Sequence, residues 1–171
     1  MNRSLMALAS IICLAVLLAL PITGKCETHT TKDSYISFDR LAIGGVQIHA
    51  SKDFVRSIHG EPNKIDDYRQ YQKYNSSTPD EVWIYKDKFA VYFFNDIVCQ
   101  VNSEGRNGLK TPDKIQVGDS EAKMIAAYGK GEKHGTKYWY KGEQNCHVVI
   151  QVVNGVIEMI LIKQELDGQN R

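Results

Sequence analysis

The sequence predicts an α+β protein with two tandem repeats, each a short helix followed by an antiparallel β-meander, and with the helices packed on one face of the sheet. The first observation is that two segments, 48–60 and 115–129, share one layout. Each has an apolar residue, a helix-capping serine, a short amphipathic stretch and a closing glycine. The second observation is that runs of β-branched and aromatic residues, separated by turn residues, follow each segment. This pattern is typical of a meander.

The first repeat is predicted over 41–108. Ser51 is suited to cap a helix over 52–59, and Gly60 is suited to end it. The strands expected in this repeat are short, and they cover 41–43, 68–74, 81–85, 89–94 and 97–101. Several of them are rich in β-branched and aromatic residues.

The second repeat is predicted over 109–163, with a helix at 120–128 that is capped by Asp119 or Ser120, and a loop at 129–135. Asn154-Gly155 is the strongest short hairpin signal in the chain. The strands expected here cover 137–140, 146–153 and 156–163. Because each repeat is too small to bury its sheet well alone, the two are expected to pack together or to share one sheet.

The N-terminus resembles an export signal. A single cation, an apolar run over 5–20 and Pro21 predict a signal peptide over 1–24, cleaved after Gly24. An uncleaved anchor and lipidation of Cys26 are the alternatives, although Lys25 departs from a lipobox. A flexible leader is expected at 25–40 and a polar tail at 164–171. The protein is therefore expected to be periplasmic, envelope-attached or secreted, with membrane contact only through its N-terminus.

Composition narrows the function classes. The chain has 21 basic and 20 acidic residues, and this balance does not favour nucleic acid, which calls for a strongly basic face. An apolar fraction of 43% is enough for a real core. Removal of Cys13 with the signal leaves three cysteines, an odd number that does not form a disulfide framework.

A family resemblance is carried by short segments of the second repeat, namely Val117-Gly118-Asp119-Ser120, Tyr128-Gly129, Tyr138-x-Tyr140 and Val153-Asn154-Gly155-Val156. They resemble the tandem units of the β-lactamase-inhibitor-protein-like fold, a superfamily shared with the small lipoprotein subunit of the outer-membrane β-barrel assembly machine. The resemblance covers about 41–163, and the first repeat departs from it at His49-Ala50. It implies an exported protein that binds other proteins through its sheet face and loops.

Alternate residues of a strand share a face, so the predicted strands divide their side chains into two sets. The aromatic set, with polar tips, is Trp83, Tyr85, Tyr92, Phe94, Tyr138, Tyr140, Gln151 and Val153. The apolar set, expected to pack on the helices, is Ile84, Val91, Phe93, Trp139, Ile150 and Val152. The aromatic set is either buried against the other repeat or open for a protein partner, since Tyr and Trp are favoured interface anchors. The candidate partner-binding residues are Trp83, Tyr85, Tyr92, Tyr138 and Tyr140, with Tyr68 and Tyr71 at the rim.

Four lysines follow the second predicted helix: Lys130, Lys133, Lys137 and Lys141. They are either solvated loop residues or a patch for an anionic partner or lipid headgroups.

The residues with catalytic potential do not form a recognisable centre. Cys146 and His147 are neighbours on one strand, so they point to opposite faces and cannot pair as nucleophile and base. The other histidines and cysteines lack zinc-site spacing, and the acids are too dispersed for a calcium loop. We therefore expect a non-catalytic protein-binding module of the cell envelope, without metal or cofactor and with an unidentified protein partner. The alternative is a small envelope hydrolase or metal-binding protein that uses His134 or Cys146.

Overall fold

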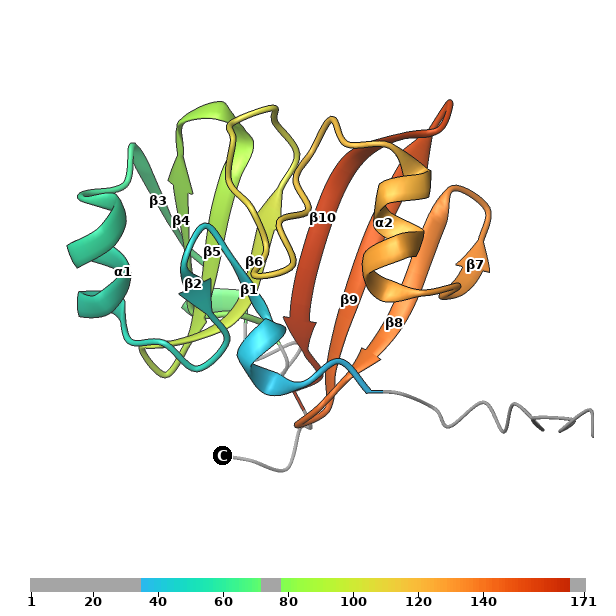
Figure 1. Cartoon of the computed structure of the whole chain (residues 1–171). Helices are drawn as coiled ribbons and strands as arrows, with labels where there is room; N and C mark the ends of the chain where they lie inside the picture. Colours follow the sequence, from blue (N-terminus) through green and yellow to red (C-terminus); the bar gives the residue numbers. More distant parts are fainter. Residues whose placement is uncertain (1–34, 72–77, 167–171) are drawn as a thin grey trace, which may run out of the picture. The chain divides into compact units, whose positions relative to one another are not determined.

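The structure is a computed structural model that describes residues 35–71 and 78–166 (Figure 1). The predicted signal peptide, Cys26, residues 72–74 of the predicted tyrosine-rich strand and the end of the predicted tail lie outside the described residues. Within the described ranges, no helix is long and apolar enough to cross a membrane.

The described chain forms an α+β fold with two α-helices, an eight-stranded antiparallel sheet and a separate two-stranded hairpin. The elements of the first half are the hairpin β1 (Ala42–Ile43) and β2 (Val46–Gln47), then α1 (Lys52–His59), β3 (Lys64–Asp67), β4 (Glu81–Tyr85), β5 (Phe89–Phe94) and β6 (Ile97–Ser103). Those of the second half are α2 (Glu121–Tyr128), β7 (Glu132–His134), β8 (Lys137–Gly142), β9 (Cys146–Val153) and β10 (Val156–Gln164).

The two halves share one sheet, in the order β3-β4-β5-β6-β10-β9-β8-β7. Each half therefore contributes four consecutive strands, and its last strand lies at the centre. There β6 and β10 pair antiparallel, with Val101 opposite Ile162 and Ser103 opposite Ile160. The expectation that the halves pack together or share a sheet is confirmed in the second form.

Both helices begin and end as their sequences predict. The hydroxyl of Ser51 accepts a hydrogen bond from the Phe54 N–H at 3.2 Å, and that of Ser120 accepts from the Lys123 N–H at 3.3 Å. A serine oxygen in this position satisfies an N–H that the first helical turn leaves unpaired. Gly60 and Gly129 close the helices at φ 72° and 79°, a region that glycine enters without strain.

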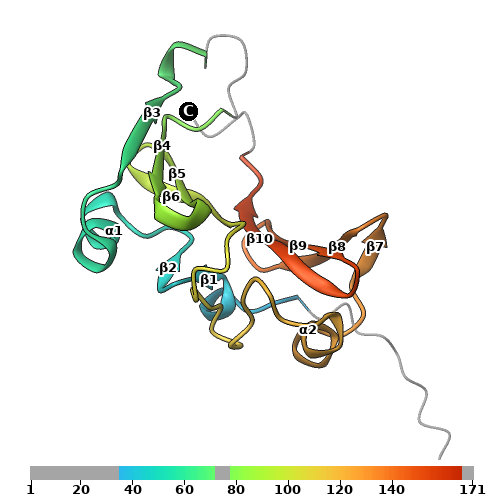
Figure 2. The same ribbon diagram turned by 90° about the horizontal axis from the view of Figure 1, so that it is seen from above.

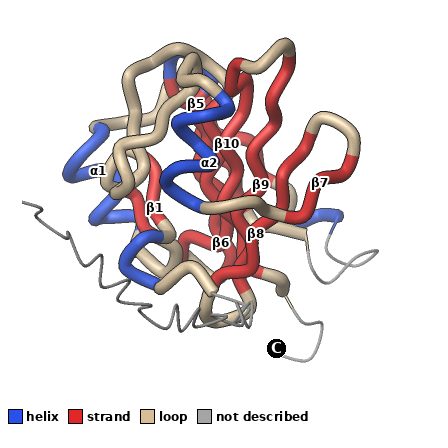
Figure 3. Tube along the Cα trace, turned by 45° about the vertical axis from the view of Figure 1, so that its right-hand side comes forward, coloured by secondary structure: helices blue, strands red, loops and turns tan. Residues whose placement is uncertain are grey.

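The helices and the β1–β2 hairpin lie on the same side of the sheet (Figure 2). In Figures 1 and 3, α2 crosses the strands of the second half. The largest side chains that are fully buried in the core between these layers include Trp83, Phe89, Phe93, Met124, Ile150 and Ile160. The opposite side of the sheet, which we call the helix-free face, has no α-helix over it in the described part of the chain (Figure 2).

Two elements differ from the sequence-based expectations. The tyrosine-rich segment was predicted as a strand over 68–74, but Arg69–Tyr71 is a 3-10 turn and the strand β3 precedes it. A strand of Lys, Ile and Asp at the edge of a sheet has no apolar alternation to reveal it, because its side chains are mostly exposed. The edge strand β7 was missed for the same reason, and it lies inside the range 129–135 that was predicted as a loop.

Part of the range expected to be a flexible leader, 25–40, belongs to the fold. Ile36 is buried, and its N–H donates a hydrogen bond to the Lys141 carbonyl oxygen at 2.8 Å. Its own carbonyl oxygen accepts from the Glu143 N–H at 2.9 Å. These two bonds attach the segment around Ile36 to the end of strand β8.

Candidate functional site

The observed strand register reverses much of the predicted division into faces. Residues that are directly opposite on paired strands share a face. Trp83 lies opposite Val91, while Tyr138 lies opposite Ile150. All of them face the helices, where Trp83 is 1% and Tyr138 6% exposed. The predicted open face formed by Trp83, Tyr85, Tyr138 and Tyr140 is therefore wrong, because these side chains belong to the helix-facing layer.

The tyrosines of this layer tie the sheet to the helices. The Tyr85 hydroxyl donates to the carbonyl oxygen of Gly60 at 3.2 Å, and the Tyr140 hydroxyl donates to that of Gly129 at 3.2 Å. Both acceptors are the glycines that close a helix. The Tyr138 hydroxyl donates to the Glu121 carboxylate in the first turn of α2. Their polar tips, which suggested a wet interface, are thus occupied inside the protein.

The other three predicted binding residues are accessible, but they lie in two different places. Tyr68 and Tyr71 are 36% and 50% exposed, and their ring centroids lie 6.0 Å apart beyond the end of β3. Tyr92 is half-buried on the helix-free face, opposite Gln100. Burial raises the pKa of its hydroxyl. Of the predicted set, these three stay available to a partner.

The helix-free face has an apolar row that runs across the sheet. Successive pairings connect its members strand by strand, from β4 to β8: Ile84, Ala90, Asn102, Leu161, Val149 and Trp139. The adjacent row is polar and cationic, from β5 to β8: Tyr92, Gln100, Lys163, His147 and Lys141. A sheet face turned to water usually carries polar side chains, so a row that is apolar except for Asn102 is the feature that needs explanation.

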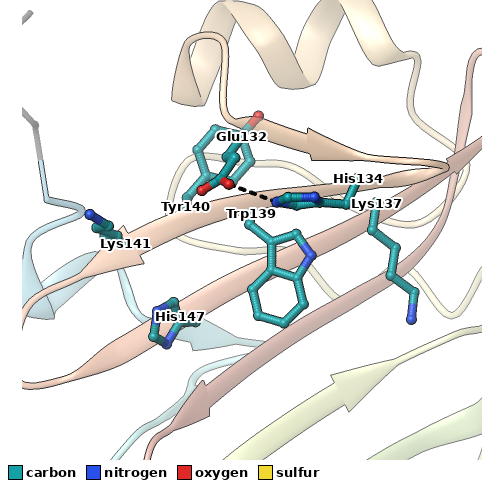
Figure 4. A pocket seen from close by; sticks show the side chains of 7 residues that line it. All are labelled: Glu132, His134, Lys137, Trp139, Tyr140, Lys141 and His147. Atoms are coloured by element: carbon teal, nitrogen blue, oxygen red, sulfur yellow. Dashed lines mark hydrogen bonds and ion pairs between the residues drawn. The ribbon is translucent and has the colours of Figure 1, made fainter.

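At the β8 end of this face lies a hollow of about 480 Å³, shown in Figure 4. Its lining residues come from β7, β8 and β9, and they are Glu132, His134, Lys137, Trp139, Tyr140, Lys141 and His147. The volume falls within the range of about 300–1,000 Å³ that is usual for binding pockets. We call this feature the Trp139 hollow.

The half-buried Trp139 indole is held in place by its neighbours. The His147 ring lies edge-on to it, with centroids 6.0 Å apart, and the Lys163 ammonium is 5.6 Å from its ring centroid. Lys163 also pairs with the Glu165 carboxylate at 2.7 Å. That hydrogen bond, together with the charges of Lys163 and His147, holds the pKa of Glu165 below its usual range. The indole is therefore a supported platform and not a free surface side chain.

Sequence reasoning missed this site because it placed Trp139 in the helix-facing set. A local signal pointed the other way. Lys137 and Lys141 stand two residues before and after Trp139, so all three share one face of β8. Two lysines in the alternation indicate the side turned to water.

Cys146 and His147 do point to opposite faces, as predicted. Cys146 is buried with the core, whereas His147 is half-buried on the helix-free face. Burial raises the pKa of the Cys146 thiol to about 11 and that of the Cys99 thiol to about 12, and both thiols are free.

The other residue with catalytic potential, His134, contacts the Glu132 carboxylate at 2.8 Å. Within the described residues, that carboxylate is its only ionic partner. No group of three or more His, Cys, Asp or Glu side chains that could hold a metal ion occurs in 35–71 or 78–166.

No protein-family model and no curated protein matches the chain. Among solved structures, it is similar to an extracellular protein containing an SCP domain from Bacillus anthracis str. Ames, with a TM-score of 0.50 and 10% identity. The match covers 69% of this chain and 44% of that one, so it spans less than half of the solved protein. At this identity the likeness concerns the fold alone.

This match overturns the resemblance to the β-lactamase-inhibitor-protein-like family. That resemblance rested on Gly-Asp-Ser, Tyr-Gly and Asn-Gly segments. The structure shows that local geometry accounts for them: Ser120 caps α2, Gly129 ends it, and Asn154 and Gly155 both have positive φ in the turn between β9 and β10. Residues required by a cap or a turn do not identify a family.

Proposed function

We propose that this protein is an exported, non-catalytic binding module that holds a protein partner on the helix-free face of its sheet. The observation that carries the proposal is the half-buried Trp139 in a hollow at the end of an apolar row. Aromatic side chains, methionine and partly buried apolar surface are typical of the centre of protein interfaces. Leu161 of the apolar row and Met159 stand two residues apart on β10, so they share the helix-free face. With Trp139 they provide such a centre, and Tyr92 provides a second aromatic group across the sheet.

Export is supported by the signal-peptide pattern over 1–24 and by the extracellular location stated for the structural neighbour. A tandem-repeat organisation is supported by contacts that recur in both halves. Ser51 forms a β-bridge with Ile97 at the start of β6, and Ser120 forms one with Val156 at the start of β10. The tyrosine-to-glycine bonds that close the two helices recur in the same way. On this interpretation, the partner lies across strands from both repeats.

Trp139→Ala combined with Met159→Ala is expected to reduce capture of the partner about tenfold or more, because a central aromatic anchor carries a large share of binding energy. The full chain is immobilised and incubated with envelope extract and culture medium, and bound proteins are quantified by mass spectrometry. The matched control is Phe54→Ala with Ile58→Ala, which removes apolar side chains that are 46% and 43% exposed on α1. Loss of the partner in the control, with retention in the Trp139 variant, would place the interface on the helices instead.

A further inference from the structure

The Trp139 hollow has a charge pattern that indicates the chemistry of its occupant. Lys137, Trp139 and Lys141 are alternate residues of β8, so their side chains stand on one face of the strand. Each is about 6.8 Å along the strand from the next. In Figure 4, Lys137 lies on one side of the indole, and His147 and Lys141 lie on the other. Two ammonium groups thus flank an aromatic platform.

Within residues 35–71 and 78–166, these two lysines have no acidic partner. No ion pair or hydrogen bond is recorded for the Lys137 or Lys141 ammonium group in the described residues. The two acids that line or adjoin the hollow have other contacts: Glu132 with the His134 ring at 2.8 Å, and Glu165 with the Lys163 ammonium at 2.7 Å. Lys137 and Lys141 therefore place an ammonium group on each side of Trp139 that no described carboxylate contacts, and an acidic ligand would complement them.

We propose that the hollow receives an extended acidic segment of the protein partner, with an apolar side chain on the Trp139 indole and a carboxylate opposite each of Lys137 and Lys141. This inference rests on the proposed function and specifies the partner's chemistry. An extended peptide repeats its side chains on one face every two residues, at the same spacing as β8. An acidic–x–apolar–x–acidic sequence therefore matches the lysine–x–tryptophan–x–lysine pattern of the strand.

Binding of such a segment has an apolar and an electrostatic contribution, and the two differ in how they depend on salt. The apolar side chain gains from removal of the indole face from water, which salt does not weaken. The exposed ion pairs give specificity and are screened, since the Debye length falls from about 14 Å to about 4 Å between about 0.05 M and 0.5 M salt. Binding should therefore be partly lost, but not abolished, at high salt.

The test uses the full chain and the peptide Ac-Glu-Ser-Phe-Ser-Glu-NH₂, with binding followed by the NMR signal of the Trp139 indole N–H. We expect saturable binding that weakens about tenfold when both glutamates of the peptide are replaced by glutamine. K137Q/K141Q is expected to weaken binding to a similar extent. K110Q/K130Q, which removes the same charge from exposed lysines outside the hollow, is expected to leave it within about twofold.

Several results would overturn the inference. The first is that the glutamate and glutamine peptides bind equally well. The second is that K137Q/K141Q binds the peptide as the wild type does. The third is that an acidic sugar oligomer such as trigalacturonate saturates the hollow while the peptide does not bind. If the peptide does not bind but the Trp139 variant still loses its partner, the acidic-segment inference fails and the proposed function stands. If the Trp139 variant keeps its partner, the proposed function itself fails. The circular dichroism spectrum of the Trp139→Ala/Met159→Ala variant, compared with that of the wild type, separates loss of the platform from loss of the fold.

Discussion

Trp83→Ala is expected to lower the free energy of unfolding by about 3–5 kcal/mol, the range for removing a large aromatic side chain from a core. Trp83 is 1% exposed, and its ring packs against Phe93 with centroids 4.7 Å apart. The Arg56 guanidinium lies 4.9 Å from the ring centroid, and the indole N–H donates to the Glu81 carboxylate at 3.1 Å. The substitution therefore leaves a cavity and removes a hydrogen bond from Glu81.

Urea denaturation of wild type, Trp83→Ala and Trp139→Ala measures the difference. Trp139 is only half-buried on the helix-free face, so its removal should cost less than half as much. The two tryptophans thus report on the two faces of one sheet. If Trp139→Ala were the more damaging change, the assignment of the core to the helix-facing side would be incorrect.

Gly105→Ala is expected to destabilise the protein by about 1–3 kcal/mol through overpacking. A Cβ atom at this position would lie inside contact distance of the Asp87 carbonyl oxygen and 2.9 Å from its carbonyl carbon. The neighbouring backbone cannot move away freely, because the Glu104 N–H bonds the Lys88 carbonyl oxygen at 3.0 Å. The Asn107 amide also donates to the Asp87 carbonyl oxygen, at 3.1 Å. The alanine must therefore break bonds that join the β4–β5 turn to the segment after β6.

Thermal unfolding of Gly105→Ala and Gly108→Ala checks this explanation. Gly108 has φ 76° but no atom within 4 Å of an added Cβ, so alanine there costs only backbone strain, about 1 kcal/mol. The Gly105 variant should therefore have the lower melting temperature. The reverse order would show that the contact with Asp87 relaxes easily.

The local features of this chain could be predicted from the sequence because they depend on neighbouring residues. The range 52–59 predicted for the first helix agrees with the observed α1, since Ser51 and Gly60 specify its ends. For the second helix, Ser120 is the cap, one of the two residues predicted for that position, and the helix itself begins one residue later, at Glu121. The β9–β10 hairpin follows from Asn154-Gly155 in the same way.

The division of side chains between the faces could not be predicted in this way, because it depends on how separate strands pair. A register shift of one residue moves every side chain of a strand to the other face. Polar residues normally reveal such an error, but Val82, Trp83, Ile84 and Tyr85 are apolar or aromatic on both sides. The register is set by the turn at Lys86–Lys88, which places Tyr85 opposite Phe89. Trp139 was misplaced by the same ambiguity, although its flanking lysines were informative.

The central claim is that the helix-free face is the binding surface, and hydroxyl-radical footprinting of the partner complex tests it most directly. Oxidation of Trp139, Met159 and Tyr92 is expected to fall on binding, because the partner covers the apolar row and the side chains beside it on the helix-free face. Oxidation of Phe54 on α1 should stay as it is in the free protein, where that side chain is 46% exposed. Protection of Phe54, with Trp139 and Met159 still oxidised as in the free protein, would contradict the account.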